Sequence, residues 1–257
     1  MTKRFQNIKN KLSPVIALAA LIVVWAAVCG FGAVPSYMLP SPGAVCRAFV
    51  TELPVMMRQA LVTLTEAFAG LGIGIILAFI FATLMDRFSF LYKALYPLLV
   101  ITQTIPTIAI APLLVLWMGY EMQPKIALVV LTTFFPITVA LLDGYKSVDP
   151  DAVSLLRSMG AGDVKIFRYL KLPASMQQFF SGLKISASYA IVGAVIAEWL
   201  GGFHGLGVYM TKVKKAYAFD KMFAVIILIV IVSLLLMLIV TLAKRLLMPW
   251  QSIKTKN

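Results

Sequence analysis

Apolar runs close to twenty residues long recur along the sequence and restrict its fold more than any other feature. A helix rises about 1.5 Å per residue, so about twenty apolar residues cross roughly 30 Å of hydrocarbon. We therefore predict an all-α integral membrane protein. Its six expected transmembrane helices cover residues 14–33, 62–85, 94–118, 125–143, 178–200 and 222–246.

The composition supports one membrane domain with short loops. Hydrophobic residues make up 61% of the 257 residues and charged residues only 13%, whereas soluble domains average roughly 45–50% and about 25%. The net charge of +13 could indicate nucleic-acid binding, but the basic residues cluster at helix ends, as membrane topology requires. We expect a cytoplasmic segment at 1–13, a membrane domain at 14–246 and a cytoplasmic tail at 247–257.

The distribution of Lys and Arg predicts the orientation. With the N-terminus inside, the inner segments hold fifteen basic residues and the outer segments seven, so both termini are expected in the cytoplasm. The lysines at 212–221 run against this rule. The apolar run after the basic N-terminus is longer than a usual signal-peptide core, which favours an uncleaved first helix.

Prolines make the third span irregular. Pro97, Pro106 and Pro112 interrupt it, and Gln103 and Thr104 place polar atoms at membrane depth. Carbonyls freed by proline are tolerated in lipid only where protein or water satisfies them. The span is either a broken helix along a transport path or a kinked packing helix.

Earlier in the chain, we expect Ser41 and Pro42 to cap and open a short amphipathic helix.

Two spans carry small residues at helical spacing, which let helix backbones approach closely. Gly70, Gly74, Ala78 and Ala82 follow each other at intervals of four in the second span. Ser186, Ala190 and Ala194 do so in the fifth. Packing within one subunit explains both stripes. The alternative is a functional one, in which the stripes lie at a subunit interface or line a translocation pore.

The segment at 144–177 is the only long inner connection, and it is polar and basic. Its first helical piece begins near Asp149-Pro150-Asp151, an acidic start with proline in the first turn. Gly160 and Gly162 interrupt the pattern, and the second piece, from Asp163 to Leu172, is expected to end at Pro173. Two short amphipathic helices beneath a membrane domain are typical of a docking element for another protein.

Here the sequence resembles the permeases of ATP-binding-cassette (ABC) importers. Their cytoplasmic "EAA" loop reads E-A-A, three residues, G, nine residues, then I-x-L-P. This chain has Ser154-Leu155-Leu156, three residues, Gly160, nine residues, then Leu170-Lys171-Leu172-Pro173. The spacing from glycine to proline matches without gaps, and the Ser-Leu-Leu triplet departs from the family pattern.

Further motifs resemble the nitrate/sulfonate/taurine-type branch of these permeases. They are Leu39-Pro40-Ser41-Pro42, the run from Ile105 to Leu113, and Gly205-Leu206-Gly207. The stretch from Ala197 to Met210 is similar to members associated with thiamine-pyrimidine precursors or related heterocycles. The favoured solute is thus such a heterocycle, and a sulfonate-, nitrate- or taurine-like anion comes next.

The resemblance implies a type I importer permease in the bacterial inner membrane. It implies a homodimer of permeases, two cytoplasmic ATPases docked on the 144–177 segment, and an extracytoplasmic binding protein that delivers a small polar solute. The implied docking residues are Ser154, Leu155, Leu156, Arg157, Gly160, Phe167, Arg168, Leu170 and Pro173. Phe167 and Leu170 are expected to act as apolar anchors. Candidates for the translocation pathway are Gln103, Thr104, Pro106 and Glu198.

Catalysis within this chain is not expected. The sequence has no G-x-x-x-x-G-K-[ST] phosphate loop, and no nucleophile–base cluster is discernible. The single histidine, His204, makes no metal site by itself, and we predict no cofactor.

Glu66 and Glu198 lie toward the outer ends of spans. At this depth, each carboxylate could be buried and functional, or it could be capped or extend to the membrane surface. The alternative function is an ion-coupled secondary transporter, which would need charged or carbonyl-rich sites near the midplane.

Overall fold

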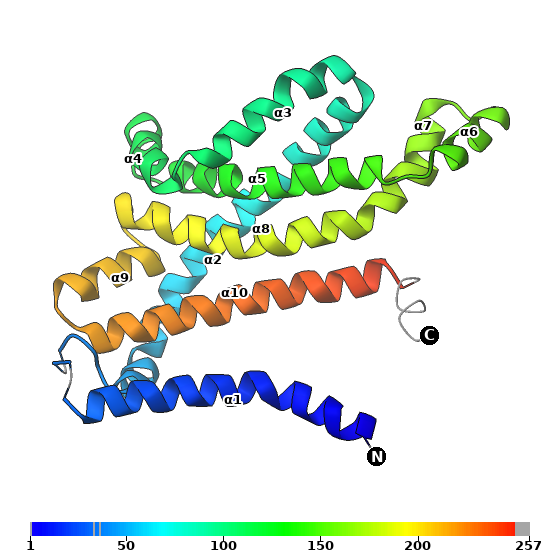
Figure 1. Ribbon diagram of the computed structural model, residues 1–257. Coiled ribbons are helices and arrows are strands. Elements are labelled where there is room, and N and C mark those ends of the chain that lie inside the picture. Colours follow the sequence, from blue (N-terminus) through cyan, green and yellow to red (C-terminus); the bar gives the residue numbers. More distant parts are fainter. Residues whose placement is uncertain (1, 33, 36, 250–257) are drawn as a thin grey trace. The chain divides into compact units, whose positions relative to one another are not determined.

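The structure, a computed structural model, describes residues 2–32, 34–35 and 37–249, and within these residues it contains helices and no strand (Figure 1). Residues 250–257 of the predicted tail lie outside the described residues. The helices are α1 (Thr2–Gly30), α2 (Pro42–Arg87), α3 (Ser89–Thr104), α4 (Thr107–Met118), α5 (Gln123–Lys146), α6 (Pro150–Ser158), α7 (Asp163–Ile166), the π-helix η1 (Phe167–Lys171), α8 (Leu172–Leu200), α9 (Leu206–Lys215) and α10 (Phe219–Leu247).

Among the described residues, five stretches of helix are long and apolar enough to cross a membrane. They are Ser13–Gly30, Pro42–Arg87, Gln123–Lys146, Asp163–Leu200 and Phe219–Leu247. The pair α3 and α4 passes the same test together but is bent by 101°. Counting this pair as one broken span gives six, which confirms the predicted all-α membrane architecture.

The chain divides into two compact units. The first comprises Met1–Met57 and Tyr209–Leu228, and the second comprises Arg58–Val208 and Ile229–Asn257. The second unit contains α3 to α8, in which α5 and α8 run side by side (Figure 1).

Helix α2 corrects one prediction. The expected short helix after Ser41 and the second span form one helix of 46 residues, about 69 Å long at 1.5 Å per residue. The Ala44 N–H donates to the Ser41 hydroxyl over 3.3 Å, so the predicted cap is present. Pro54 lies inside the helix without ending it, and no glycine pair or other breaker separates residue 54 from the apolar stretch that follows.

The small-residue stripes lie in intrachain contacts. A Cβ on Gly70 would lie 2.5 Å from Val129, and one on Gly74 would lie 2.5 Å from the Thr133 hydroxyl. The Ser186 hydroxyl donates to the Thr133 carbonyl over 3.0 Å. Helices α2 and α8 therefore both approach α5 closely, and packing within one subunit accounts for these positions.

Candidate functional site

The 144–177 segment forms two helical pieces around a glycine turn, as the sequence predicts. The Asp149 carboxylate accepts a hydrogen bond from the Asp151 N–H over 2.9 Å, and Pro150 opens α6. Gly160 follows α6 with φ +81°, a left-handed conformation that favours glycine. The space around its missing Cβ is open, so the backbone, rather than crowding, requires glycine here.

The second piece does not end at Pro173. Helix α7 continues into η1 and then into α8, with Pro173 in the first turn of α8. In a regular helix the proline ring clashes with a carbonyl of the preceding turn. Here the π turn η1 directly precedes α8, and Pro173 lies in the first turn of α8. The segment is therefore a direct extension of the long helix α8.

Exposed apolar side chains gather on this segment. Leu155, Met159, Val164 and Tyr169 are exposed, Val164 to 81%. The two predicted anchors, Phe167 and Leu170, are half-buried, and the Phe167 ring packs edge-on against Tyr145 at 5.3 Å between centroids. Both remain predicted contact residues, but the four exposed side chains offer more free apolar surface. The spacing of four residues between Leu155 and Met159 could have identified these two, whereas Val164 and Tyr169 are five residues apart and show no such pattern.

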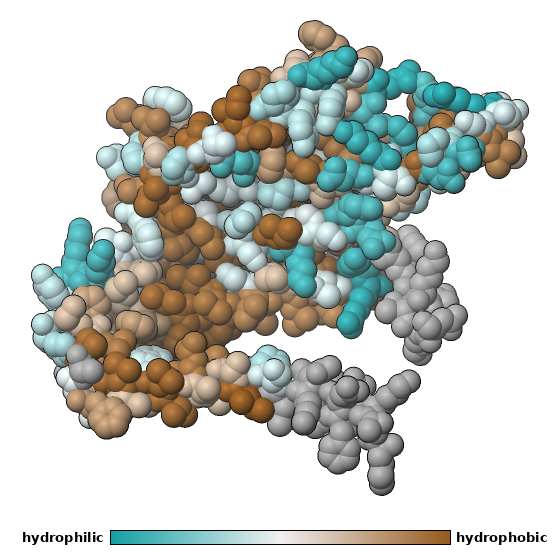
Figure 2. All heavy atoms as spheres, viewed as in Figure 1, coloured by the Kyte–Doolittle hydropathy of each residue, from teal (hydrophilic) through white to brown (hydrophobic). Residues whose placement is uncertain are grey.

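The remaining predicted docking residues are accessible. Ser154, Arg157, Gly160, Arg168 and Pro173 are exposed and Leu156 is half-buried. Hydrophilic residues also gather over α6 and α7 (Figure 2). The segment thus combines a polar surface with several exposed apolar side chains.

Ion pairs connect this segment to the end of α2. Asp163 pairs with Arg87 and, at 3.5 Å, with Arg157. The Lys171 ammonium lies 2.8 Å from the Asp86 carboxylate. These residues line a cavity of about 520 Å³.

The break between α3 and α4 borders a second cavity, of about 280 Å³. Its lining is Thr102, Gln103, Ile105, Thr107, Ile110, Leu131, Thr132, Tyr189, Val192, Gly193 and Ile196. None of these residues is charged. Pro106 stands at the break, immediately before α4, so the predicted interruption is present. Pro97 and Pro112 lie inside their helices.

The structure separates the four pathway candidates. Gln103 lines the cavity, and Pro106 forms the adjoining bend. Thr104 is exposed and its hydroxyl donates to the Ile101 carbonyl over 2.8 Å. Glu198 is buried elsewhere, 2% exposed.

Glu198 belongs to a hydrogen-bonded cluster at the start of α9, which we call the α9 cap. Glu198 Oε2 accepts from the Gly207 N–H over 2.6 Å, and Oε1 accepts from the Thr63 hydroxyl over 2.7 Å. The Leu206 N–H donates to the Thr63 hydroxyl oxygen over 2.9 Å, and the Gly205 N–H donates to Gln59 Oε1 over 2.7 Å. Side chains of α2 and α8 therefore satisfy three consecutive amides that a helix start leaves without intrahelical partners.

A buried ion pair lies in the same unit. The Lys125 ammonium is 3.0 Å from Glu66 Oε1, and both side chains are almost fully buried. Sequence reasoning treated Lys125 only as an outer basic residue and missed Gln59 and Thr63. Gln59, Thr63 and Glu66 are spaced by four and three residues, so they share one face of an apolar helix. This spacing of polar residues was the feature of the sequence that could have predicted a polar site on this helix face.

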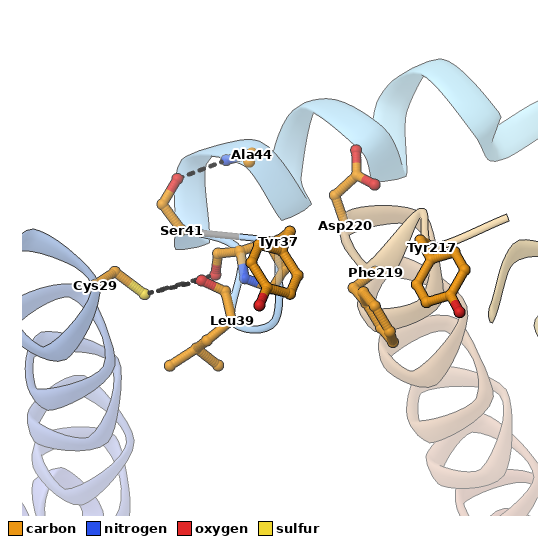
Figure 3. A pocket seen from close by; sticks show the side chains of 9 residues that line it. Cys29, Tyr37, Leu39, Ser41, Ala44, Tyr217, Phe219 and Asp220 are labelled. Atoms are coloured by element: carbon orange, nitrogen blue, oxygen red, sulfur yellow. Dashed lines mark hydrogen bonds between the residues drawn. The ribbon is translucent and has the colours of Figure 1, made fainter. Parts of the chain in front are cut away.

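The first unit contains its own pocket, of about 300 Å³ (Figure 3). Tyr37, Phe219 and Asp220 line it, and the Cys29 thiol at its edge donates to the Leu39 carbonyl over 3.6 Å. In the same unit the Tyr209 hydroxyl donates to Glu52 over 2.8 Å. Burial, followed by this bond to a carboxylate, raises the pKa of Tyr209 above its ordinary value.

Comparison with known proteins identifies the class that this architecture defines. Residues 70–252 match the family described as "Binding-protein-dependent transport system inner membrane component". The chain belongs to this family and is a multi-pass inner-membrane permease of the ABC importer type.

Two relatives show its place among these permeases. The formylaminopyrimidine transport permease protein ThiX of Halalkalibacterium halodurans is 34% identical over 241 residues, which cover 93% of this chain and 96% of ThiX. A Bacillus subtilis protein named for aliphatic sulfonates transport, SsuC, is 30% identical over 261 residues, covering 97% and 90%. Both fit the branch that the sequence motifs indicated.

A solved structure has the same fold. A chain of the MetNI methionine ABC transporter superposes with a TM-score of 0.67 at 18% identity. The match covers 76% of this chain and 97% of the MetNI chain. The type I importer permease architecture is thereby confirmed.

Proposed function

We propose that the chain forms the membrane pathway for a thiamine-pyrimidine precursor or a similar uncharged heterocycle. Two copies would form the pathway, an extracytoplasmic binding protein would deliver the solute, and two cytoplasmic ATPases would dock on the 144–177 segments. Both termini would lie in the cytoplasm. This arrangement follows the family and the Lys/Arg distribution.

The observation that carries the choice of solute is the uncharged lining of the cavity at the α3–α4 break. A sulfonate keeps its negative charge, and a charge in a low-dielectric site requires a cation or several donors as partners. The cavity offers the Gln103 amide, threonine hydroxyls and the Tyr189 ring, which suit a flat polar heterocycle through hydrogen bonds and ring contact. The 34% identity to ThiX supports the same choice.

Uptake by the reconstituted complex tests this proposal. Vesicles containing the permease and its ATPase, supplied with the binding protein, should accumulate labelled formylaminopyrimidine on ATP addition and should not accumulate an alkanesulfonate. ATP-dependent uptake of the sulfonate alone would refute the heterocycle assignment. Uptake by the permease alone under an ion gradient would instead support a secondary transporter.

Two neighbouring substitutions test the cavity. Gln103→Ala removes an amide that lines it, and Thr104→Ala removes a neighbouring hydroxyl that does not. We expect Gln103→Ala to lower uptake about tenfold, corresponding to one hydrogen bond of roughly 1.4 kcal/mol. Thr104→Ala should leave uptake unchanged. Equal effects of the two substitutions would remove the cavity from the pathway.

The docking assignment has a separate test. With the native Cys29 and Cys46 replaced by serine, single cysteines introduced at Met159 or Val164, both exposed, should react with impermeant thiol reagents only from the cytoplasmic side. Labelling from the outside would contradict the proposed orientation and the ATPase contact together. A cysteine at the exposed Tyr217 should show the opposite accessibility.

A further inference from the structure

The cap of α9 joins α9 to the helix that carries the proposed docking segment. Glu198 lies near the C-terminal end of α8 and accepts a hydrogen bond from the Gly207 N–H. At its other end, α8 continues directly from η1. With 29 residues, α8 is about 43 Å long at 1.5 Å per residue, so one helix connects the two locations.

The cap is specific rather than an incidental contact. Gly205 adopts φ +118°, and a Cβ there would collide with the Glu198 carboxylate. A Cβ on Gly207 would collide with the Val195 carbonyl. Two glycines thus allow the backbone at the start of α9 to approach α8 closely. Thr63 and Gln59 of α2 complete the cap, and Thr63 and Glu198 are almost fully buried.

Helix α9 also presents a surface to solvent. Lys212, Lys214 and Lys215 are exposed in its last turns. In the proposed orientation, α9 lies on the extracytoplasmic side, where the binding protein arrives. The same helix is therefore accessible near its C-terminus and bonded to α8 at its N-terminus.

We propose that Glu198 is a positioning residue that couples α9 to α8, so that engagement of the binding protein changes ATPase activity at the other end of α8. This inference rests on the proposed function. A displacement of the start of α9 carries the Gly205, Leu206 and Gly207 amides with it, and these amides are bonded to Gln59, Thr63 and Glu198, respectively. Because buried donors and acceptors are costly to leave unpaired, α8 and α2 must follow the displacement or lose those bonds.

The test compares basal and stimulated ATPase activity in the complete complex. Permease, ATPase and binding protein are reconstituted in nanodiscs, and the ATPase rate is measured without and with saturating binding protein and its solute. Glu198→Gln keeps the shape of the side chain but replaces one acceptor oxygen by an NH₂ group. We expect the stimulated-to-basal ratio to fall towards one, while basal activity and ATPase binding stay unchanged.

Two further variants make the result specific. Thr63→Val removes the hydroxyl that bridges Glu198 and the Leu206 N–H, and it should lower the same ratio. Combined with Glu198→Gln it should add little, because both changes disrupt one cluster. Glu121→Gln removes another carboxylate, which is exposed in the α4–α5 connection, and should leave the ratio unchanged.

The outcomes separate the inference from the proposed function. An unchanged ratio in Glu198→Gln and in Thr63→Val would overturn the inference. So would a parallel fall of basal and stimulated rates together with a lower melting temperature, which indicates a purely structural role. If the unmodified permease fails to bind the ATPase, or shows no stimulation by the binding protein, the proposed function itself fails.

Discussion

The two ends of the second unit differ in how deeply most of their charged residues are buried, although the Lys171–Asp86 pair at the 144–177 end is also largely buried. At the α9 end, Glu66, Lys125 and Glu198 are buried and bonded to groups of the same unit. At the 144–177 end, Arg87, Arg157 and Asp163 form ion pairs in largely exposed positions. The first set cannot rearrange without leaving a buried polar or charged group without its partner, whereas the exposed pairs can exchange partners at low cost.

Apolar residues show the same contrast. At the α9 end, the helix start is covered and Leu206 is fully buried. At the 144–177 end, Leu155, Met159, Val164 and Tyr169 remain exposed. A surface that exposes apolar side chains among exchangeable charges is suited to a separate protein. A buried, hydrogen-bonded cluster such as the α9 cap is suited to holding helices of the same chain together.

The largest effect should come from unpairing the buried ion pair. Lys125→Ala leaves the Glu66 carboxylate buried without its cation and should destabilise the protein by about 3–5 kcal/mol. Thermal unfolding in detergent, followed by tryptophan fluorescence, measures the loss. The double variant Lys125→Met, Glu66→Gln should recover most of it, because no charge then remains unpaired. A single variant as stable as the unmodified protein would show that water reaches this pair.

A smaller loss is expected from the backbone of the α9 cap. Gly205→Ala places a Cβ at φ +118° and against the Glu198 carboxylate, which should cost roughly 1–3 kcal/mol. Gly43→Ala is the matched control, since its Cβ would meet open space and alanine favours a helix more than glycine does. We expect Gly43→Ala to be neutral or slightly stabilising in the same unfolding experiment. Equal melting temperatures for both variants would contradict the observed close approach.

The sequence predicted the α9 cap only in part, and the reason is physical. The glycines at 205 and 207 and the carboxylate at 198 were visible in the motif from Ala197 to Met210. Hydropathy places Glu198 at a helix end, but it does not show which backbone amides it meets. Lys125 was missed because its burial depends on Glu66, 59 positions earlier in the chain, and pairing between distant helices leaves no local pattern.

The 144–177 segment was predicted more completely because its features are local. Asp149 and Pro150 start a helix and Gly160 ends one through properties of single residues. The continuation through Pro173 was missed because a π turn depends on the hydrogen bonding of the whole junction. The break at Pro106 follows from proline chemistry, whereas its 101° bend depends on packing against α5 and α8.

A functional effect with little loss of stability is expected at the 144–177 end. Gly160→Val forces a β-branched residue into a left-handed conformation, which costs about 1–2 kcal/mol, and changes the turn between α6 and α7. Co-purification of the ATPase should be lost while the permease remains folded in the membrane. Gly162→Ala, at a glycine with φ −72° and open space around it, should retain the ATPase. Normal ATPase binding and transport by Gly160→Val would refute the docking assignment.

The smallest effect on stability should come from an exposed ion pair. This pair tests directly whether charges at the 144–177 end contribute less to stability than the buried charges near α9. Arg87→Ala removes a partner of Asp163, but Arg157 lies close enough to compensate, and exposed pairs contribute little to stability. The melting temperature should therefore stay unchanged, in contrast to Lys125→Ala. Since Arg87 lines the cavity beside α7, the variant should instead weaken the ATPase complex, and the weakening should shrink as salt is raised. A lower melting temperature with normal ATPase binding would mean that this charge, like Lys125, serves the fold rather than a partner.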